Sequence, residues 1–140
     1  MRSTAWVSRW LKARVTSSST SYVSVDATNL VLTVPVIPNG FVVGLSAAGV
    51  LGVQTATAIV GVALFDGTTL LQEQKVQPAV SGVAAQVAFG IQWVIVGDGL
   101  THVFSLKYKT TAGADSVVMF NDSATHVPTL VAQLTQSNFI

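Results

Sequence analysis

Side chains able to do acid–base or metal chemistry are few and scattered in this sequence. Its 140 residues include two histidines, six carboxylates and no cysteine. His102 and His126 show neither the HxxxH nor the HxH spacing of a metal site, and no thiolate is available as ligand or nucleophile. His102 begins an alternating segment on the same face as Phe104, so we expect a hydrogen-bonded structural histidine. His126 follows Asn121 and Asp122, where a cation held by loop oxygens is the alternative, but no calcium-loop spacing supports it.

Patterns typical of catalytic sites are also absent. Four carboxylates stand near glycines or in turns, where bonds to backbone amides explain them: Asp66, Asp98, Asp115 and Asp122. The sequence has no GxSxG elbow, and the GVLG segment at 49–52 lacks the Lys-Ser/Thr of a phosphate loop. Nothing places two carboxylates about 5–10 Å apart in a cleft, as glycoside hydrolysis requires. We therefore expect no enzymatic activity, no metal and no cofactor.

Charge is scarce and unevenly placed. Seven Lys/Arg and six Asp/Glu make up 9% of the chain, against about 25% in an average soluble protein, and mean hydropathy is +0.59. Four cations and no acid fall within the first 14 residues, so the remainder carries a net charge of −3. A net charge of +1 gives no broad basic field, so no nucleic-acid partner is expected. So little charge implies that lipid or other protein covers part of the surface.

If lipid rather than protein covers the surface, the chain is a membrane protein, which is a different class of protein. Residues 27–65 and 76–97 contain no charge, and each exceeds the roughly 20 residues that span a bilayer. A small two-span membrane protein, similar to a phage holin, is therefore one hypothesis. The apolar residues are mostly Val, Ala and Ile, and Pro38-Asn39-Gly40 is a turn signal inside the first stretch. We favour coverage by protein and expect no membrane partner.

Residues 1–20 form a basic arm by their composition. Trp6 and Trp10 stand four residues apart, and Val7 and Leu11 repeat that spacing, which predicts a short amphipathic helix before the polar segment TSSST at 16–20. Aromatic and arginine side chains are enriched at interface hot spots. We predict a partner-binding arm made of Trp6, Arg9, Trp10, Lys12 and Arg14. An arm folded back on its own domain and an arm lying on a membrane surface are the alternatives.

From residue 21 the pattern changes to strands. Period-two alternation and short apolar runs predict eight or nine strands, at residues 22–25, 30–36, 41–47, 54–65, 69–76, 83–96, 102–110, 116–120 and 129–135. Turn signals separate them, and no helical period follows any strand. Residues 21–140 are therefore predicted to form one all-β domain, an antiparallel eight-stranded jelly-roll sandwich.

Two segments are apolar on both strand faces, at residues 58–65 and 93–96. An antiparallel sandwich normally exposes one face of each sheet to water. Strands that are apolar on both faces predict that the outer face contacts another subunit. Sheets packed around a three-fold axis would form one such closed oligomer. The predicted subunit interface comprises Ile59, Val62, Leu64, Trp93 and Ile95.

Three segments carry a resemblance to a known family. THVFSLKYKT at 101–110 with AGA at 112–114, GVALFDGTT at 61–69 and PTLVAQL at 128–134 resemble strands and hairpins of small jelly-roll domains in tailed-phage virions. The resemblance covers roughly residues 20–136, and the arm has no counterpart. It implies a tumour-necrosis-factor-like fold, a homotrimer, and service as a capsid decoration (cement) protein, head fibre or tail-fibre tip.

These observations define the functional hypotheses. The first is a trimeric decoration protein on the capsid exterior of the virion, which binds the major capsid protein and stabilises the phage head. The second is a tail-fibre tip or head-fibre domain that recognises a host surface receptor through loops 76–82, 110–116 and 121–128. The two-span membrane protein is the third.

Overall fold

The chain is all-β in the computed structural model, which describes residues 4–12, 15–53, 59–77, 87–111, 117–119 and 128–136. No helix occurs among these residues. The strands are β1 (Thr4–Trp10), β2 (Val15–Ser17), β3 (Val23–Ser24), β4 (Val31–Val34), β5 (Phe41–Val53), β6 (Val60–Asp66), β7 (Thr69–Val76), β8 (Val87–Val96), β9 (His102–Thr110), β10 (Val117–Met119) and β11 (Thr129–Gln136).

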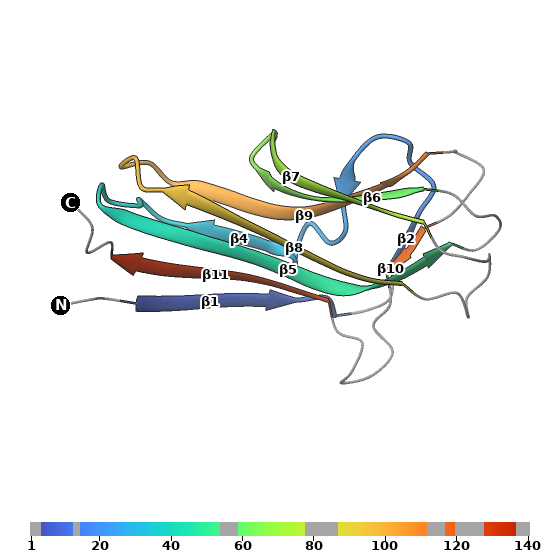
Figure 1. Cartoon of the computed structure of the whole chain (residues 1–140), viewed down its shortest axis with the longest axis horizontal. Helices are drawn as coiled ribbons and strands as arrows, with labels where there is room; N and C mark the ends of the chain where they lie inside the picture. Colours follow the sequence, from blue (N-terminus) through green and yellow to red (C-terminus); the bar gives the residue numbers. More distant parts are fainter. Residues whose placement is uncertain are drawn as a thin grey trace.

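The strands form two antiparallel sheets that pack face to face (Figure 1). In the six-stranded sheet, hydrogen-bonded neighbours follow the order β1-β11-β5-β10-β2. β8 lies off this path and also pairs with β5. The five-stranded sheet runs β3-β9-β6-β7, with β4 also paired to β9. The chain passes from one sheet to the other after β2, β4, β5, β7, β8 and β9, as in a jelly roll. The predicted fold class, an antiparallel jelly-roll-like sandwich, is confirmed.

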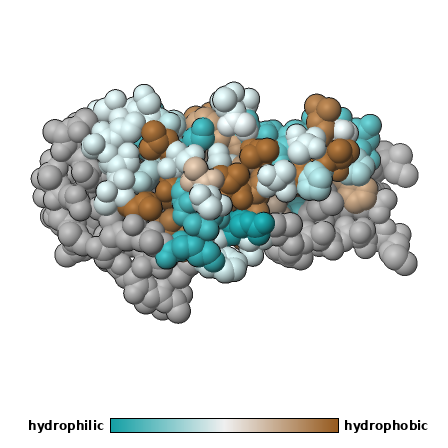
Figure 2. Space-filling model, turned by 180° about the vertical axis from the view of Figure 1, so that it is seen from behind, coloured by the Kyte–Doolittle hydropathy of each residue, from teal (hydrophilic) through white to brown (hydrophobic). Residues whose placement is uncertain are grey.

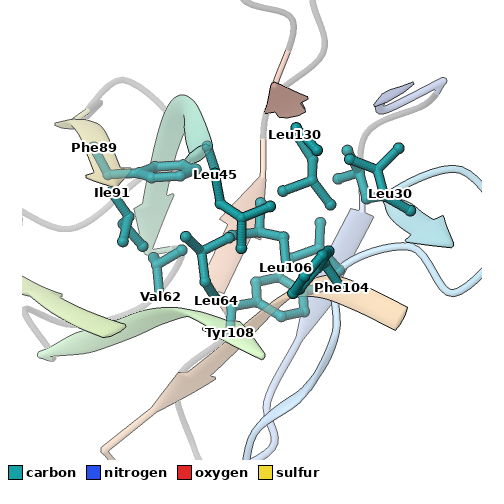
Figure 3. Close-up of a cluster of buried hydrophobic side chains, with 14 of the residues drawn as sticks. Leu30, Leu45, Val62, Leu64, Phe89, Ile91, Phe104, Leu106, Tyr108 and Leu130 are labelled. Carbon is teal, nitrogen blue, oxygen red and sulfur yellow. The ribbon is translucent and has the colours of Figure 1, made fainter. Parts of the chain in front are cut away.

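Large apolar side chains from both sheets fill the space between them (Figure 3). The six-stranded sheet contributes Leu45, Ile91 and Leu130, and the five-stranded sheet contributes Leu64 and Phe104, all of which are buried. Each comes from a strand whose alternate residues point the other way, because successive strand side chains project to opposite faces.

Most predicted strands coincide with observed ones, but two segments differ. The GVLG segment at 49–52, predicted as a loop, lies inside the 13-residue strand β5. β8 pairs with β5 as far as Leu51, and β10 pairs with Leu51 to Val53, so hydrogen bonding to neighbours continues the strand through both glycines. The polar segment predicted at 16–20 contributes to β2, which pairs with β10.

The predicted N-terminal helix is wrong. Residues 4–10 form β1, and all seven pair with β11, from Thr4 opposite Thr135 to Trp10 opposite Thr129. The chain then anchors at Leu11, which is fully buried and donates its backbone N–H to the Pro128 carbonyl at 3.0 Å. Residues four positions apart lie on the same side of a strand as well as on the same side of a helix, so the spacing of Trp6 and Trp10 fits both. Residues 4–10 form a strand because they pair with the edge of β11.

The charge-free stretches do not form the helices that a two-span membrane protein needs. Residues 27–65 supply β4, β5 and β6, and residues 76–97 supply β8. Within the part of the chain that the structure describes, no helix is long and apolar enough to cross a membrane.

Candidate functional site

The outer face of the six-stranded sheet is built without ionisable side chains. On β5, Leu45 and Ala47 point into the core, so the alternate residues of β5 and those paired with them on β8, β11 and β1 face outward. These outward residues are Val42, Gly44, Ser46, Ala48 and Val50 on β5; Ala88, Gly90, Gln92, Val94 and Val96 on β8; Thr129, Val131 and Gln133 on β11; and Ser8 and Trp10 on β1. We call this set the uncharged face.

A shallow groove follows the centre of the uncharged face. Gly44 lies between Gln133 and Val94 in the register, and Ser46 lies between Val131 and Gln92. Because β5 presents small residues between larger ones on its neighbours, the surface is hollowed along it, with a volume of about 300 Å³.

A ridge of exposed valines borders this groove on β8. The side chains of Val94 and Val96 are 61% and 68% exposed. Figure 2 shows that apolar side chains reach the surface among hydrophilic ones on the side of the molecule that it draws. Val94 and Val96 adjoin the groove and an uncharged surface, a combination that is typical of an interface.

The outer face of the five-stranded sheet has the opposite character. Lys107 and Lys109 on β9 and Glu73 and Lys75 on β7 flank β6, whose own outward residues there are small. The phenolic hydroxyl of Tyr22 donates a hydrogen bond to Glu73, and burial together with that carboxylate raises the pKa of Tyr22. All three cations that follow residue 14 therefore lie on one face of the sandwich.

The residues predicted for the subunit interface are placed differently from the prediction. Val62 and Leu64 are fully buried between the sheets, so they have no surface to offer a second subunit, and the prediction is wrong for both. Trp93 and Ile95 pair with Leu45 and Val43, which point into the core, so they lie on the inner side of β8. Trp93 stays 39% exposed because β8 is an edge strand.

Ile59, the fifth predicted interface residue, precedes β6 and is 39% exposed. Its carbonyl accepts the backbone N–H of Thr111 at 3.1 Å. It does not belong to the uncharged face, and its predicted role at an interface stays a prediction.

The predicted arm residues lie at the edge of the six-stranded sheet. Trp10 is 46% exposed, and the ammonium group of Lys12 sits 3.7 Å from the centroid of its indole ring. Arg9 is exposed and donates from Nη1 to the Ser8 carbonyl at 3.0 Å. Trp6 pairs with Gln133. Arg14 lies outside the described residues.

His102 is held between two carboxylates at one end of the sandwich. Its Nδ1 lies 2.6 Å from Asp66 Oδ2, and its Nε2 lies 2.9 Å from Asp98 Oδ1. Hydrogen bonds to Asp98 and Asp66 raise the pKa of His102, and the bond to His102 is the main cause that lowers the pKa of Asp98. The expectation of a hydrogen-bonded structural histidine is confirmed.

The sequence carries no signal for the pairing of His102 with Asp66, which is 36 residues away. Asp98 also accepts the Leu100 backbone N–H at 3.0 Å, as expected of a turn carboxylate. His126, Asp115 and Asp122 lie outside the described residues. Among the residues that are described, no cluster of three or more His, Asp or Glu could hold a metal ion.

Comparisons with known proteins yield similarities of structure only. No family model and no curated protein matches the chain. The baseplate tripod of bacteriophage Tuc2009 is similar at 8% identity and a TM-score of 0.47, over 96% of this chain and 64% of that one. The VP2 protein of infectious bursal disease virus is similar at 10% identity and a TM-score of 0.49, over 94% of this chain and 39% of that one. The sugar-binding C-terminal domain of EclA is similar at 10% identity and a TM-score of 0.44, over 84% and 76%. This chain thus spans less than two thirds of the phage tripod chain.

Proposed function

We propose that this protein is a structural component of a phage particle, a homotrimer that decorates the exterior of the capsid and acts without catalysis. The observation that carries this proposal is the uncharged face, which spans β1, β11, β5 and β8 in a chain with only 9% charged residues. The likeness of its segments to phage jelly-roll domains supplies the virion context.

The contrast between the two outer faces supports self-association. Lys75, Lys107 and Lys109 keep the five-stranded sheet compatible with water, whereas the six-stranded sheet offers exposed valines beside a groove. In a rotationally symmetric trimer each subunit uses one part of this face against each neighbour, so the ridge of one copy can meet the groove of the next. Three copies then cover one another's uncharged faces.

Attachment to the capsid is assigned to the edge of this face. Trp10 and Lys12 are adjacent, and both are exposed where β1 ends. Tryptophan is among the residues that are enriched at interface hot spots. A trimer carrying three such anchors bridges several capsid subunits, and a ligand that binds only the assembled shell stabilises it.

Two measurements test the proposal. Sedimentation of the isolated chain must give a trimer, and a stable monomer contradicts it. Binding to phage heads lacking the protein is then measured for a Trp10→Ser, Lys12→Ser double variant, which leaves the pairing of β1 with β11 intact. Val103→Ser is the matched control, because Val103 is 42% exposed on the other sheet. Loss of head binding in the double variant alone supports the anchor, and equal binding of both variants refutes it.

A second candidate function rests on the lining of the groove. Ser46, Gln92 and Gln133 offer one hydroxyl and two amides without any charge, a chemistry that fits the hydroxyls of a neutral saccharide. A receptor-binding fibre domain would use such a site. The loops predicted for that role, at 76–82, 110–116 and 121–128, lie largely outside the described residues. Binding of neutral glycans by a chain whose groove stays open in solution would favour this candidate over the decoration role.

A further inference from the structure

The Asp66–His102–Asp98 cluster joins segments that are distant in sequence. Asp66 ends β6 at the turn into β7, Asp98 lies in the loop between β8 and β9, and His102 begins β9. The imidazole side chain is 11% exposed and stacks on Phe104, with ring centroids 5.8 Å apart and planes 6° from parallel. The ring therefore has one fixed orientation, with a carboxylate at each nitrogen.

This geometry requires two protons on the ring. An ionised carboxylate is only a hydrogen-bond acceptor, so each ring nitrogen must donate, and only the imidazolium form carries both N–H groups. Neutral His102 would set the lone pair of one nitrogen against a carboxylate oxygen at 2.6 or 2.9 Å. The folded arrangement thus favours protonated His102 on hydrogen-bonding grounds alone.

The cluster lies within a network of loop contacts. Asp98 Oδ1 accepts from both His102 Nε2 and the Leu100 N–H, so one oxygen serves the ring and the loop backbone. The Gly67 N–H donates to the Val103 carbonyl at 2.8 Å, next to His102. Loss of the ring proton therefore affects both the β6–β7 turn and the β8–β9 loop.

We propose that Asp66, His102 and Asp98 form a pH-sensitive latch, which holds the β6–β7 turn and the β8–β9 loop together while His102 is protonated and loosens them when that proton leaves. Among the described residues, the charged groups in contact with the ring are Asp66 from β6 and Asp98 from the loop. β4 pairs Val34 with His102, and neither β4 nor the segment 35–40 contains an ionisable residue. The first ionisable residue on β7 is Glu73, seven positions beyond Asp66.

The direction of the pH effect follows from the two groups. The pKa of His102 is raised above 6.5, so its stabilisation is complete below 6.5 and is lost as pH rises through the raised value. The pKa of Asp98 is lowered from 3.8, so its contribution is complete above 3.8 and is lost as pH falls through the lowered value. The latch is closed between these limits and opens on the alkaline side, as pH rises through the raised pKa of His102.

Nuclear magnetic resonance of the full chain tests the latch. The ring protons of His102 are titrated from about pH 5 to about pH 9, a range that brackets the ordinary histidine pKa of about 6.5, and are assigned by their loss in His102→Gln. Amide exchange of Leu100 and Gly67 is followed over the same range, corrected for intrinsic pH dependence. The Val25 amide, bonded to the Leu106 carbonyl at 3.0 Å in another part of the sandwich, is the internal control.

We expect His102 to titrate above 6.5, and the corrected exchange of Leu100 and Gly67 to rise about ten- to hundredfold beyond that titration while Val25 does not change. In His102→Gln the rise must disappear, because glutamine has no titrating proton. Titration of His102 at or below 6.5 overturns the proposal, and so does an identical exchange profile in His102→Gln. If His102→Gln does not fold, Asp98→Asn must lower the midpoint of His102, and an unchanged midpoint overturns the proposal.

Discussion

Replacement of Val94 by lysine separates self-association from folding. Val94 is 61% exposed on the uncharged face and pairs with Gly44 at the groove. A lysine there reaches water in an isolated subunit, so the free energy of folding should change by no more than about 0.5 kcal/mol. Complete burial of a valine side chain is worth about 1.5–3 kcal/mol. Covering the part still exposed is therefore worth about 1–2 kcal/mol per subunit, or about 3–6 kcal/mol for a trimer.

That loss corresponds to about a hundred- to ten-thousandfold weaker trimerisation, before the added cost of burying an unpaired ammonium group. Sedimentation velocity over a concentration series measures it, and circular dichroism with thermal unfolding verifies the fold. Val103→Lys is the matched control, the same change at a 42% exposed strand position on the other sheet. The reasoning is refuted if the Val94→Lys protein trimerises as tightly as the wild type, or if the Val103→Lys protein dissociates equally.

Two glycine positions give predictions for stability. In Gly97→Ala the new methyl would lie 2.0 Å from the Pro38 carbonyl oxygen, so the loops must separate and lose backbone hydrogen bonds; we expect a cost of about 2–4 kcal/mol by chemical denaturation. Gly90→Ala, where nothing lies within 4 Å, is its control and should change stability by less than about 1 kcal/mol. In Gly61→Ala the methyl would overlap the Tyr22 hydroxyl, so we expect a loss of about 1–3 kcal/mol that is largely absent when the same change is made in a Tyr22→Ala background.

The sequence predicts strand orientation well where one face of the strand is polar. β9 alternates Phe104, Leu106 and Tyr108 with Ser105, Lys107 and Lys109, and the apolar set is buried as the alternation predicts. The lysines identify the outer side without any knowledge of the partner strands. The same rule cannot be applied to β6 and β8. The central residues of these two strands include no charged side chain, so the sequence does not indicate which face of the strand is the outer one.

The errors in the predicted interface come from this missing marker. The sequence predicts Trp93 and Ile95 at the subunit interface, whereas it is their neighbours Val94 and Val96 that face outward on β8. A shift of one residue moves every side chain of a strand to the opposite face. Only the pairing of β8 with β5, whose core side is defined by Leu45, fixes the choice.

Long-range pairing also explains why the N-terminal structure and the histidine cluster escaped prediction. β1 is defined by its partner β11, more than 100 residues later, and no local pattern distinguishes a strand from a helix over seven residues with two tryptophans. His102 could be predicted as a bonded histidine from its place on β9. Its partner Asp66 could not, because the turn that carries it reaches His102 only when β6 and β9 pair.

The two outer faces lack charge on their central strands for different structural reasons, and the difference decides which sheet the proposed interface would use. On β6 the outward residues Gly61 and Ala63 are buried, and the side chains of Tyr22 and Lys109 lie against Gly61 within the subunit. On β5 the outward residues Gly44 and Ser46 have no such cover, and the exposed valine ridge stands beside them. A dry outer face on β6 therefore needs no partner, whereas the equally uncharged face of β5 stays open to water until another molecule covers it. Of the two described faces, the six-stranded sheet is therefore the one to which we assign the proposed subunit contact.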